Sequence, residues 1–184
     1  TDYLLFPTGP VKVSSRDGRK VYLGAVSTGD VTFALGYLNG PIFNGDLDNI
    51  MIQELGSSDF RPLTNQTLKI RSFQFLTSIR KLTGLQLLVM KVTDRDTNRN
   101  GRLTDDDIAS LYISDLKGDT FKKLTPEFHE LLNWKILKVN QRLYFRTLED
   151  SDKNGLFNKE DKIHHFYVSL DDSQLTVVEY NPLG

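Results

Sequence analysis

The sequence contains no cysteine, so disulfide bonds and thiolate metal sites are excluded. A charge excess of one sign is also lacking. The formal net charge is −1, without the basic excess that nucleic-acid binding or attachment to a membrane surface requires. The longest apolar run, residues 87–90, is far below the roughly 18 residues of a membrane span. We therefore predict no nucleic-acid partner and no transmembrane segment within this sequence.

Residues for covalent catalysis are scarce too. The sequence has no cysteine nucleophile and no G-x-S-x-G motif, and its glycines at 36–45 do not form a phosphate-binding loop. Only three histidines are present, and His164 and His165 are neighbours on an expected strand, so their side chains point to opposite faces. We interpret these two and His129 as surface or edge residues and not as a zinc site. The sequence thus predicts no enzymatic activity, with a carboxylate pair of the glycosidase type as the open alternative.

A stretch rich in Asp and Asn, residues 93–107, has the ligand spacing of a twelve-residue calcium loop. Oxygen ligands fall at positions 1, 3, 5, 7 (through a backbone carbonyl) and 12, which are Asp96, Asn98, Asn100, Arg102 and Asp107. Gly101 occupies position 6, where the chain turns sharply, and Leu103 is the apolar residue at position 8. Because Ca²⁺ needs six to eight oxygens from one short segment, this spacing predicts a calcium site.

The same spacing occurs again 54 residues further along the chain. The second set of ligands is Asp150, Asp152, Asn154, Leu156 (through its backbone carbonyl) and Asp161, with Gly155 at position 6. Two loops with matching offsets favour calcium over the simpler alternative, in which Asp and Asn only cap backbone groups of surface turns. We therefore predict two Ca²⁺ sites. A third acidic segment has its glycine in the wrong place, and we interpret it as a loop without an ion: Asn44, Asp46 and Asp48.

Segments rich in β-branched and aromatic residues, separated by Gly, Pro, Asp and Asn, predict an all-β fold. The expected strands are residues 3–6, 11–14, 20–26, 31–38, 49–55, 68–76, 85–93, 110–116, 132–139, 142–148, 164–170 and 175–180. Helical periodicity is confined to two short segments, 104–109 and 125–132. We predict one domain over residues 1–184, built of three four-stranded units like propeller blades, at about 10–66, 67–127 and 128–182. The alternative is a β-sandwich or barrel of antiparallel hairpins.

The segment L-Y-I-S-D-L-K-G-D-T-F-K-K-L-T-P, residues 111–126, resembles the outer half of a TolB-type β-propeller repeat. S-S-R-D-G-R-K-V-Y-L, residues 14–23, resembles the turn between the first two strands of such a blade. The inserted loops resemble EF-hand-type calcium loops of bacterial exported proteins. They depart from the helix–loop–helix pattern, because a strand precedes each loop. Both also carry Asp at position 12, where Glu is usual, and the shorter side chain implies weaker affinity.

The resemblance implies a location in the periplasm or, as a lipoprotein, at the bacterial cell envelope, and because the sequence begins at Thr1 we expect an export signal to have been removed. Three units are fewer than the four to eight blades of a closed propeller. We therefore expect either a homodimer or an irregular closure in which residues 3–6 pair with a strand of the last unit. Trp134 is expected to anchor the core of that unit.

These observations predict a non-enzymatic, calcium-binding, all-β module for scaffolding or recognition at the bacterial cell envelope. Its partner is a protein or a glycan that the sequence does not name. The alternative is a carbohydrate- or peptidoglycan-active enzyme, or the accessory domain of one.

Overall fold

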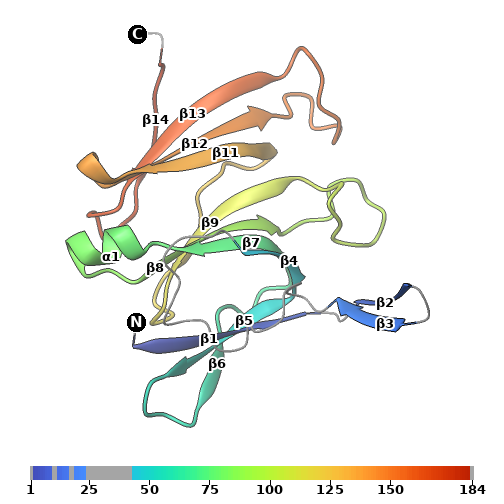
Figure 1. Cartoon of the computed structure of the whole chain (residues 1–184). Coiled ribbons are helices and arrows are strands. Elements are labelled where there is room, and N and C mark those ends of the chain that lie inside the picture. The colour runs from blue at the N-terminus through green and yellow to red at the C-terminus, as the bar shows by residue number, and fades with distance from the viewer. Residues whose placement is uncertain (1, 10–11, 17–18, 24–42, 183–184) are drawn as a thin grey trace.

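Antiparallel strands make up almost all of the regular structure (Figure 1). The computed structural model describes residues 2–9, 12–16, 19–23 and 43–182. The strands are β1 (Tyr3–Thr8), β2 (Lys12–Arg16), β3 (Arg19–Leu23), β4 (Phe43–Leu47), β5 (Asn49–Glu54), β6 (Phe60–Pro62), β7 (Lys69–Phe75), β8 (Leu87–Thr93), β9 (Ala109–Asp115), β10 (Phe121–Lys123), β11 (His129–Leu137), β12 (Arg142–Glu149), β13 (Lys162–Ser169) and β14 (Val177–Glu179). The all-β prediction is confirmed. The expected strand at 31–38 lies outside the described residues.

The described strands form three larger sheets and one hairpin. The N-terminal sheet has the order β1-β5-β6, the central sheet β10-β9-β8-β7-β4, and the C-terminal sheet β11-β12-β13-β14, while β2 pairs with β3. Within them, β7–β10 and β11–β14 are two consecutive four-stranded meanders. None of the sheets formed by the described residues closes on itself, so the barrel alternative is not the observed architecture.

Residues 10–66 do not form a four-stranded meander of their own within the described part of the chain. β4 pairs with β7 of the central sheet, while β5 pairs with β6 on one side and with β1 on the other. The expected pairing of residues 3–6 with the last unit is therefore wrong. Leu5 lies opposite Ile52 instead, and both side chains are buried in one core. The register of a strand is fixed where one face is buried, and the core that Leu5 shares with Ile52 sets the register of β1 on β5.

The central sheet is buried on both of its faces. Along β8, Leu88 and Met90 belong to a first core shared with the N-terminal sheet, whereas Leu87 and Val89 belong to a second core shared with the C-terminal sheet. Successive side chains of a strand point to opposite faces, so a nearly continuous apolar run such as β8 suits a sheet covered on both sides. The three larger sheets consequently stack as successive layers, which Figure 1 shows from the side.

One short helix, α1 (Thr77–Thr83), connects β7 to β8 and is absent from the expected elements. Its one buried residue, Ile79, joins the second core, and a single buried position gives too little periodicity to be recognised in a sequence. The helical turn expected at 125–132 is wrong, because the chain is strand β11 from His129 onward; a 3-10 turn, η2 (Lys138–Asn140), follows that strand. No helix in the described residues is long and apolar enough to cross a membrane.

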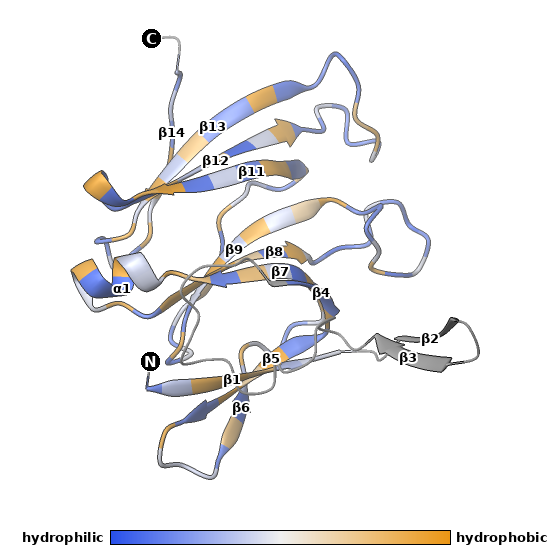
Figure 2. Ribbon diagram, viewed as in Figure 1, coloured by the Kyte–Doolittle hydropathy of each residue, from blue (hydrophilic) through white to orange (hydrophobic). Residues whose placement is uncertain are grey.

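The two calcium-type loops occupy equivalent places in successive sheets. The first connects β8 to β9 in the central sheet, and the second connects β12 to β13 in the C-terminal sheet. Each loop therefore follows the second strand of a meander. Figure 2 shows both loops as mainly hydrophilic, in contrast to the strands that carry them. Segments that are 54 residues apart in the sequence thus come to the same side of the molecule (Figure 1).

Candidate metal centres

The last carboxylate of the first loop, Asp107, accepts hydrogen bonds from backbone groups of the same loop. Asp107 Oδ1 accepts hydrogen bonds from the backbone N–H groups of Thr97 (2.8 Å) and Asn98 (3.1 Å), and its Oδ2 accepts from Thr104 N–H (2.8 Å). Burial raises the pKa of Asp107, but these backbone N–H groups more than offset it and lower the pKa below its ordinary value. Asp107 is therefore an ionised carboxylate at only 4% exposure, fixed at position 12.

The first half of this loop winds around its own side-chain oxygens. Asp96 accepts hydrogen bonds from the N–H groups of Asn100 (3.0 Å) and Gly101 (2.7 Å). The side-chain oxygens of Asn98 and Asn100 accept from the N–H groups two residues further on, at 3.0 and 2.9 Å. Two left-handed residues close the winding, with φ of 59° at Arg99 (position 4) and 80° at Gly101 (position 6). Positions 1, 3 and 5 therefore turn their oxygens toward the inside of the loop.

The second loop repeats this arrangement at the same offsets. Asp161 at position 12 accepts from Ser151 N–H (3.1 Å) and Asn158 N–H (2.7 Å), which are positions 2 and 9. Asp150 at position 1 accepts from the N–H groups of Asn154 (3.2 Å) and Gly155 (2.8 Å), which are positions 5 and 6. The left-handed residues recur as well, with φ of 58° at position 4 (Lys153) and 79° at position 6. The two loops thus share one backbone fold.

Positions 3, 5 and 7 of the second loop also correspond to those of the first. Asp152 Oδ1 accepts from Asn154 N–H (3.2 Å), and Asn154 Oδ1 accepts from Leu156 N–H (2.6 Å). The three carboxylates at ligand positions, Asp150, Asp152 and Asp161, do not bring their oxygens within 4.8 Å of one another. Backbone N–H groups hold these oxygens, so an ion bound here has to draw them inward.

The two loops contact each other. Gly155 of the second loop lies so close to Thr97 of the first that a Cβ built on the glycine would be 3.3 Å from the Thr97 carbonyl oxygen. Both loops also approach the ring of Phe128, a residue of the segment that joins the two meanders. The guanidinium carbon of Arg95 and the Nζ of Lys153 lie 5.7 and 5.1 Å from the centroid of this ring. One aromatic ring therefore receives a cation from each loop.

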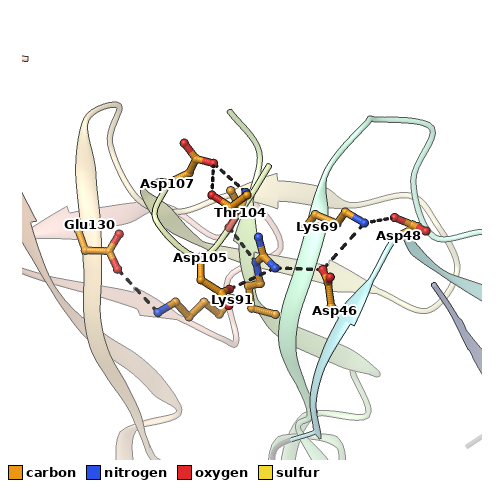
Figure 3. A network of polar contacts seen from close by, with 10 residues as sticks. Asp46, Asp48, Lys69, Lys91, Thr104, Asp105, Asp107 and Glu130 are labelled. Atoms are coloured by element: carbon orange, nitrogen blue, oxygen red, sulfur yellow. Dashed lines mark hydrogen bonds and ion pairs between the residues drawn. The ribbon is translucent and has the colours of Figure 1, made fainter. Parts of the chain in front are cut away.

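A polar network connects the first loop to the neighbouring strands (Figure 3). Arg71 of β7 pairs through Nη1 with Asp46 of β4 (3.0 Å) and with Asp105 of the loop (3.2 Å). Its Nε donates to Thr93 Oγ1 at 3.1 Å. In the segment interpreted as a third loop without an ion, Asp48 pairs with Lys69 at 2.6 Å, so both aspartates of that segment are engaged with cations.

The histidines are arranged differently from the sequence-based interpretation. His129 lies on β11, an edge strand of its sheet, but it is buried, with 7% exposure, and its ring centroid lies 5.0 Å from that of His164, so it is not a surface residue. Burial lowers the pKa of His129. Burial also disfavours the charged form of His164, but hydrogen bonds to Glu179 and Glu149 outweigh it and raise the pKa of this ring. His129 and His164 come together only through strand pairing, which no local motif announces.

Trp134 is partly buried against the second core and lines a cavity of about 510 Å³. The expectation that it anchors the core is therefore confirmed in part. Polar side chains of β7 and β8 line the same cavity, including Gln74 and Lys91, and Leu132 and Asn133 flank the tryptophan on β11. None of the described residues that line this cavity is Asp or Glu.

Comparisons with known proteins identify no relative. No protein-family model, no curated protein and no solved structure matches the chain. The structural class of this chain therefore rests on its own architecture. It is an all-β protein of stacked antiparallel sheets that carries two equivalent acidic loops. The resemblance to TolB-type repeats and to EF-hand-type loops stays a prediction.

Proposed function

We propose that this chain is a calcium-stabilised, non-enzymatic β-module for scaffolding or recognition, with one Ca²⁺ in each loop. The ligands of the first site are Asp96, Asn98, Asn100, the carbonyl of Arg102 and Asp107; those of the second are Asp150, Asp152, Asn154, the carbonyl of Leu156 and Asp161. The observation that carries the proposal is the repetition of one hydrogen-bond pattern at positions 1, 2, 5, 6, 9 and 12 of both loops. Independent surface turns have no reason to share it.

The role of the ions in this proposal is structural. Gly155 contacts Thr97, so the two acidic loops lie against each other, and their carboxylates repel one another unless cations are present. An ion in each loop removes this repulsion and fixes the contact between the central and C-terminal sheets. Dissociation constants of about 10⁻⁴–10⁻³ M, the range of extracellular modules, suit such a role where calcium is abundant.

The architecture supports a propeller-like arrangement of the two meanders. Propeller blades are four-stranded antiparallel sheets that pack face to face, and the central and C-terminal sheets share a core in this way. On this proposal the chain functions at the bacterial cell envelope, as an exported protein or lipoprotein. β11 and β4 are edge strands of their sheets within the described residues. They offer the surface for self-association into a homodimer or for a protein partner.

The calcium proposal is tested by isothermal titration calorimetry on protein freed of metal with a chelator. We expect two equivalents of Ca²⁺ to bind, and Mg²⁺ to bind far more weakly, because Mg²⁺ demands octahedral geometry and dehydrates reluctantly. The matched control is the double variant Asp96→Ala/Asp150→Ala, which should lose both calcium-binding phases. Circular dichroism checks that this variant is folded. Absence of calcium heat in the unmodified protein would refute the proposal.

A second candidate function is glycan recognition, as an accessory domain of carbohydrate or peptidoglycan metabolism. The cavity beside Trp134 favours it, because an aromatic platform flanked by amide and amine side chains suits sugar rings. Trp134 is the one tryptophan of the chain, so its fluorescence reports directly on this cavity. Saturable quenching by peptidoglycan fragments that disappears in Asn133→Ala would support glycan recognition. An unchanged emission spectrum would exclude binding of these fragments beside the ring.

A further inference from the structure

Three side chains gather on one face of the C-terminal sheet, at its end nearest the second loop. In β11, His129 lies directly opposite Glu149 of β12, and Thr147 of β12 lies opposite His164 of β13. Residues two apart on a strand share a face, so Thr147 and Glu149 point to the same side. Strand register therefore places His129, Glu149 and His164 together, although 35 residues of sequence separate the two histidines.

The distances among these three side chains suit a common ion. One ligand atom from each lies within 4.8 Å of the others, and within the described residues theirs is the one group of three His, Asp or Glu side chains that does so. His164 Nε2 and Glu149 Oε2 are 3.0 Å apart. A tetrahedral site with metal–ligand distances of about 2.0–2.1 Å holds its ligand atoms about 3.3 Å apart. Because no separation exceeds 4.8 Å, none has to shorten by more than about 1.5 Å to reach that spacing.

Both histidines are held on their other ring nitrogen. His129 Nδ1 lies 2.8 Å from the hydroxyl of Thr147, which is fully buried, and His164 Nδ1 lies 2.7 Å from Glu179 Oε1 on β14. Metal-binding histidines almost always have such a partner, which fixes the ring and leaves the opposite nitrogen for the metal. Here the nitrogen left on each ring is Nε2. Four strands therefore contribute to the arrangement. Three side chains supply the ligands, and Thr147 and Glu179 hold the two histidine rings.

We propose that His129, Glu149 and His164 form a binding site for a first-row transition metal ion, Zn²⁺ in the first instance, distinct from the two calcium loops. Two imidazoles and one carboxylate are ligands that Zn²⁺ prefers, whereas Ca²⁺ binds through oxygen alone. In this site the metal takes the place of the proton that His164 and Glu149 share. Three protein ligands leave a fourth position for water.

Titration with Co²⁺ tests the proposal, because four-coordinate Co²⁺ absorbs visible light far more strongly than the aqueous ion and so reports on its own ligands. The protein is prepared without a histidine tag and is first freed of metal. We expect one equivalent of Co²⁺ to give an intense visible spectrum, Zn²⁺ to abolish it by competition, and Ca²⁺ at millimolar concentration to leave it unchanged. Absence of the Co²⁺ spectrum, or its loss on addition of Ca²⁺, would overturn the proposal.

Matched variants separate this site from its surroundings. His164→Gln and Glu149→Gln should each weaken Co²⁺ binding by about tenfold or more. His165→Gln should leave it unchanged, because His165 is the next residue on β13 and points to the opposite face, against Tyr180. Glu179→Gln keeps the ligands and loosens the His164 ring, so a loss of about tenfold is expected from its positioning role. Equal losses in His164→Gln and His165→Gln, with both folds intact by circular dichroism, would refute the assignment.

The calcium proposal and the transition-metal proposal fail independently. Asp152→Ala removes a proposed calcium ligand and should leave the Co²⁺ spectrum intact, because Asp152 lies outside the group of three side chains. Loss of the spectrum in Asp152→Ala would assign the Co²⁺ to the second loop and refute the histidine site.

Discussion

Gly155 lies against the carbonyl oxygen of Thr97, and this contact joins two loops that are far apart in the sequence. A Cβ on Gly155 would be 3.3 Å from that oxygen, which is tighter than most such contacts. The backbone φ of +79° at this position also favours glycine. Gly101, which holds the same position in the first loop, has φ of +80°, and a Cβ added there would meet no atom within 4 Å. The two glycines therefore differ in their neighbours and not in their backbone.

This difference predicts unequal effects of Gly155→Ala and Gly101→Ala. Each variant forces an alanine into the left-handed region, at a cost of about 1 kcal/mol. Gly155→Ala additionally pushes against Thr97, and we expect its total loss of unfolding free energy to be about 2 kcal/mol. Urea denaturation of both variants in the presence of calcium measures the difference. Equal losses would mean that the two loops are not in contact in solution.

The second loop should bind calcium more tightly than the first. Its ligand side chains include three carboxylates, Asp150, Asp152 and Asp161, whereas the first loop has two, because position 3 is Asn98 there. Affinity for calcium depends on the number of charged ligands. In a calcium titration, Asp150→Ala should remove the tighter phase and Asp96→Ala the weaker one. The reverse assignment of the two phases would contradict this ranking.

Position 3 offers a matched exchange between the loops. Asp152→Asn gives the second loop the side chain of the first and should weaken it about tenfold, while Asn98→Asp should tighten the first by a similar factor. Calorimetry of the single variants and of the double exchange measures both changes. If the double exchange leaves the order of the two phases as it was, charge at position 3 does not set the ranking.

Removal of calcium should loosen the loops without unfolding the sheets. At about 1 mM free calcium, dissociation constants of about 10⁻⁴–10⁻³ M stabilise the fold by roughly 0.4–1.4 kcal/mol per site. Such an increment raises the melting temperature by a few degrees. Neither apolar core contains a residue of the two loops. Far-ultraviolet circular dichroism in chelator should therefore retain its β-sheet signal, and complete loss of that signal would show that the ions are required for folding.

Arg71 and Lys69 provide a comparison of two ion pairs on the same strand. Arg71, with a side chain 12% exposed, pairs with Asp46 (31% exposed) and Asp105 (88% exposed), whereas Lys69, 22% exposed, pairs most closely with Asp48 (58% exposed). Arg71 makes two ion pairs and also donates a hydrogen bond to Thr93, and hydrogen bonds of charged groups contribute more than an exposed ion pair does. We expect Arg71→Met to lower the unfolding free energy by about 2 kcal/mol and Lys69→Met by less than about 1 kcal/mol. Urea denaturation measures both, and a larger loss in Lys69→Met would contradict this account.

Local features of this chain can be read from its sequence because their interactions span few residues. The alternating and continuous apolar runs predict the strands, and β8 lies within the expected segment 85–93. Of the turn expected at 104–109, the first part is present, as a hydrogen bond from Asp107 N–H to the Thr104 carbonyl, and strand β9 begins at Ala109. Each loop closes on itself within twelve residues, so the offsets of Asp, Asn and Gly are enough to propose its ligands.

Only the tertiary structure decides which strands are neighbours and what their faces bring together. The apolar pattern of β1 is equally compatible with pairing to the last unit, and the shared core of Leu5 and Ile52 selects β5 instead. The closeness of His129 to His164 depends on the register of three strands, and the contact of Gly155 with Thr97 depends on the packing of two sheets. The two-residue period of a strand predicts which face of the sheet each side chain occupies. It does not predict which other strand or sheet covers that face, because this depends on burial summed over segments distant in the sequence.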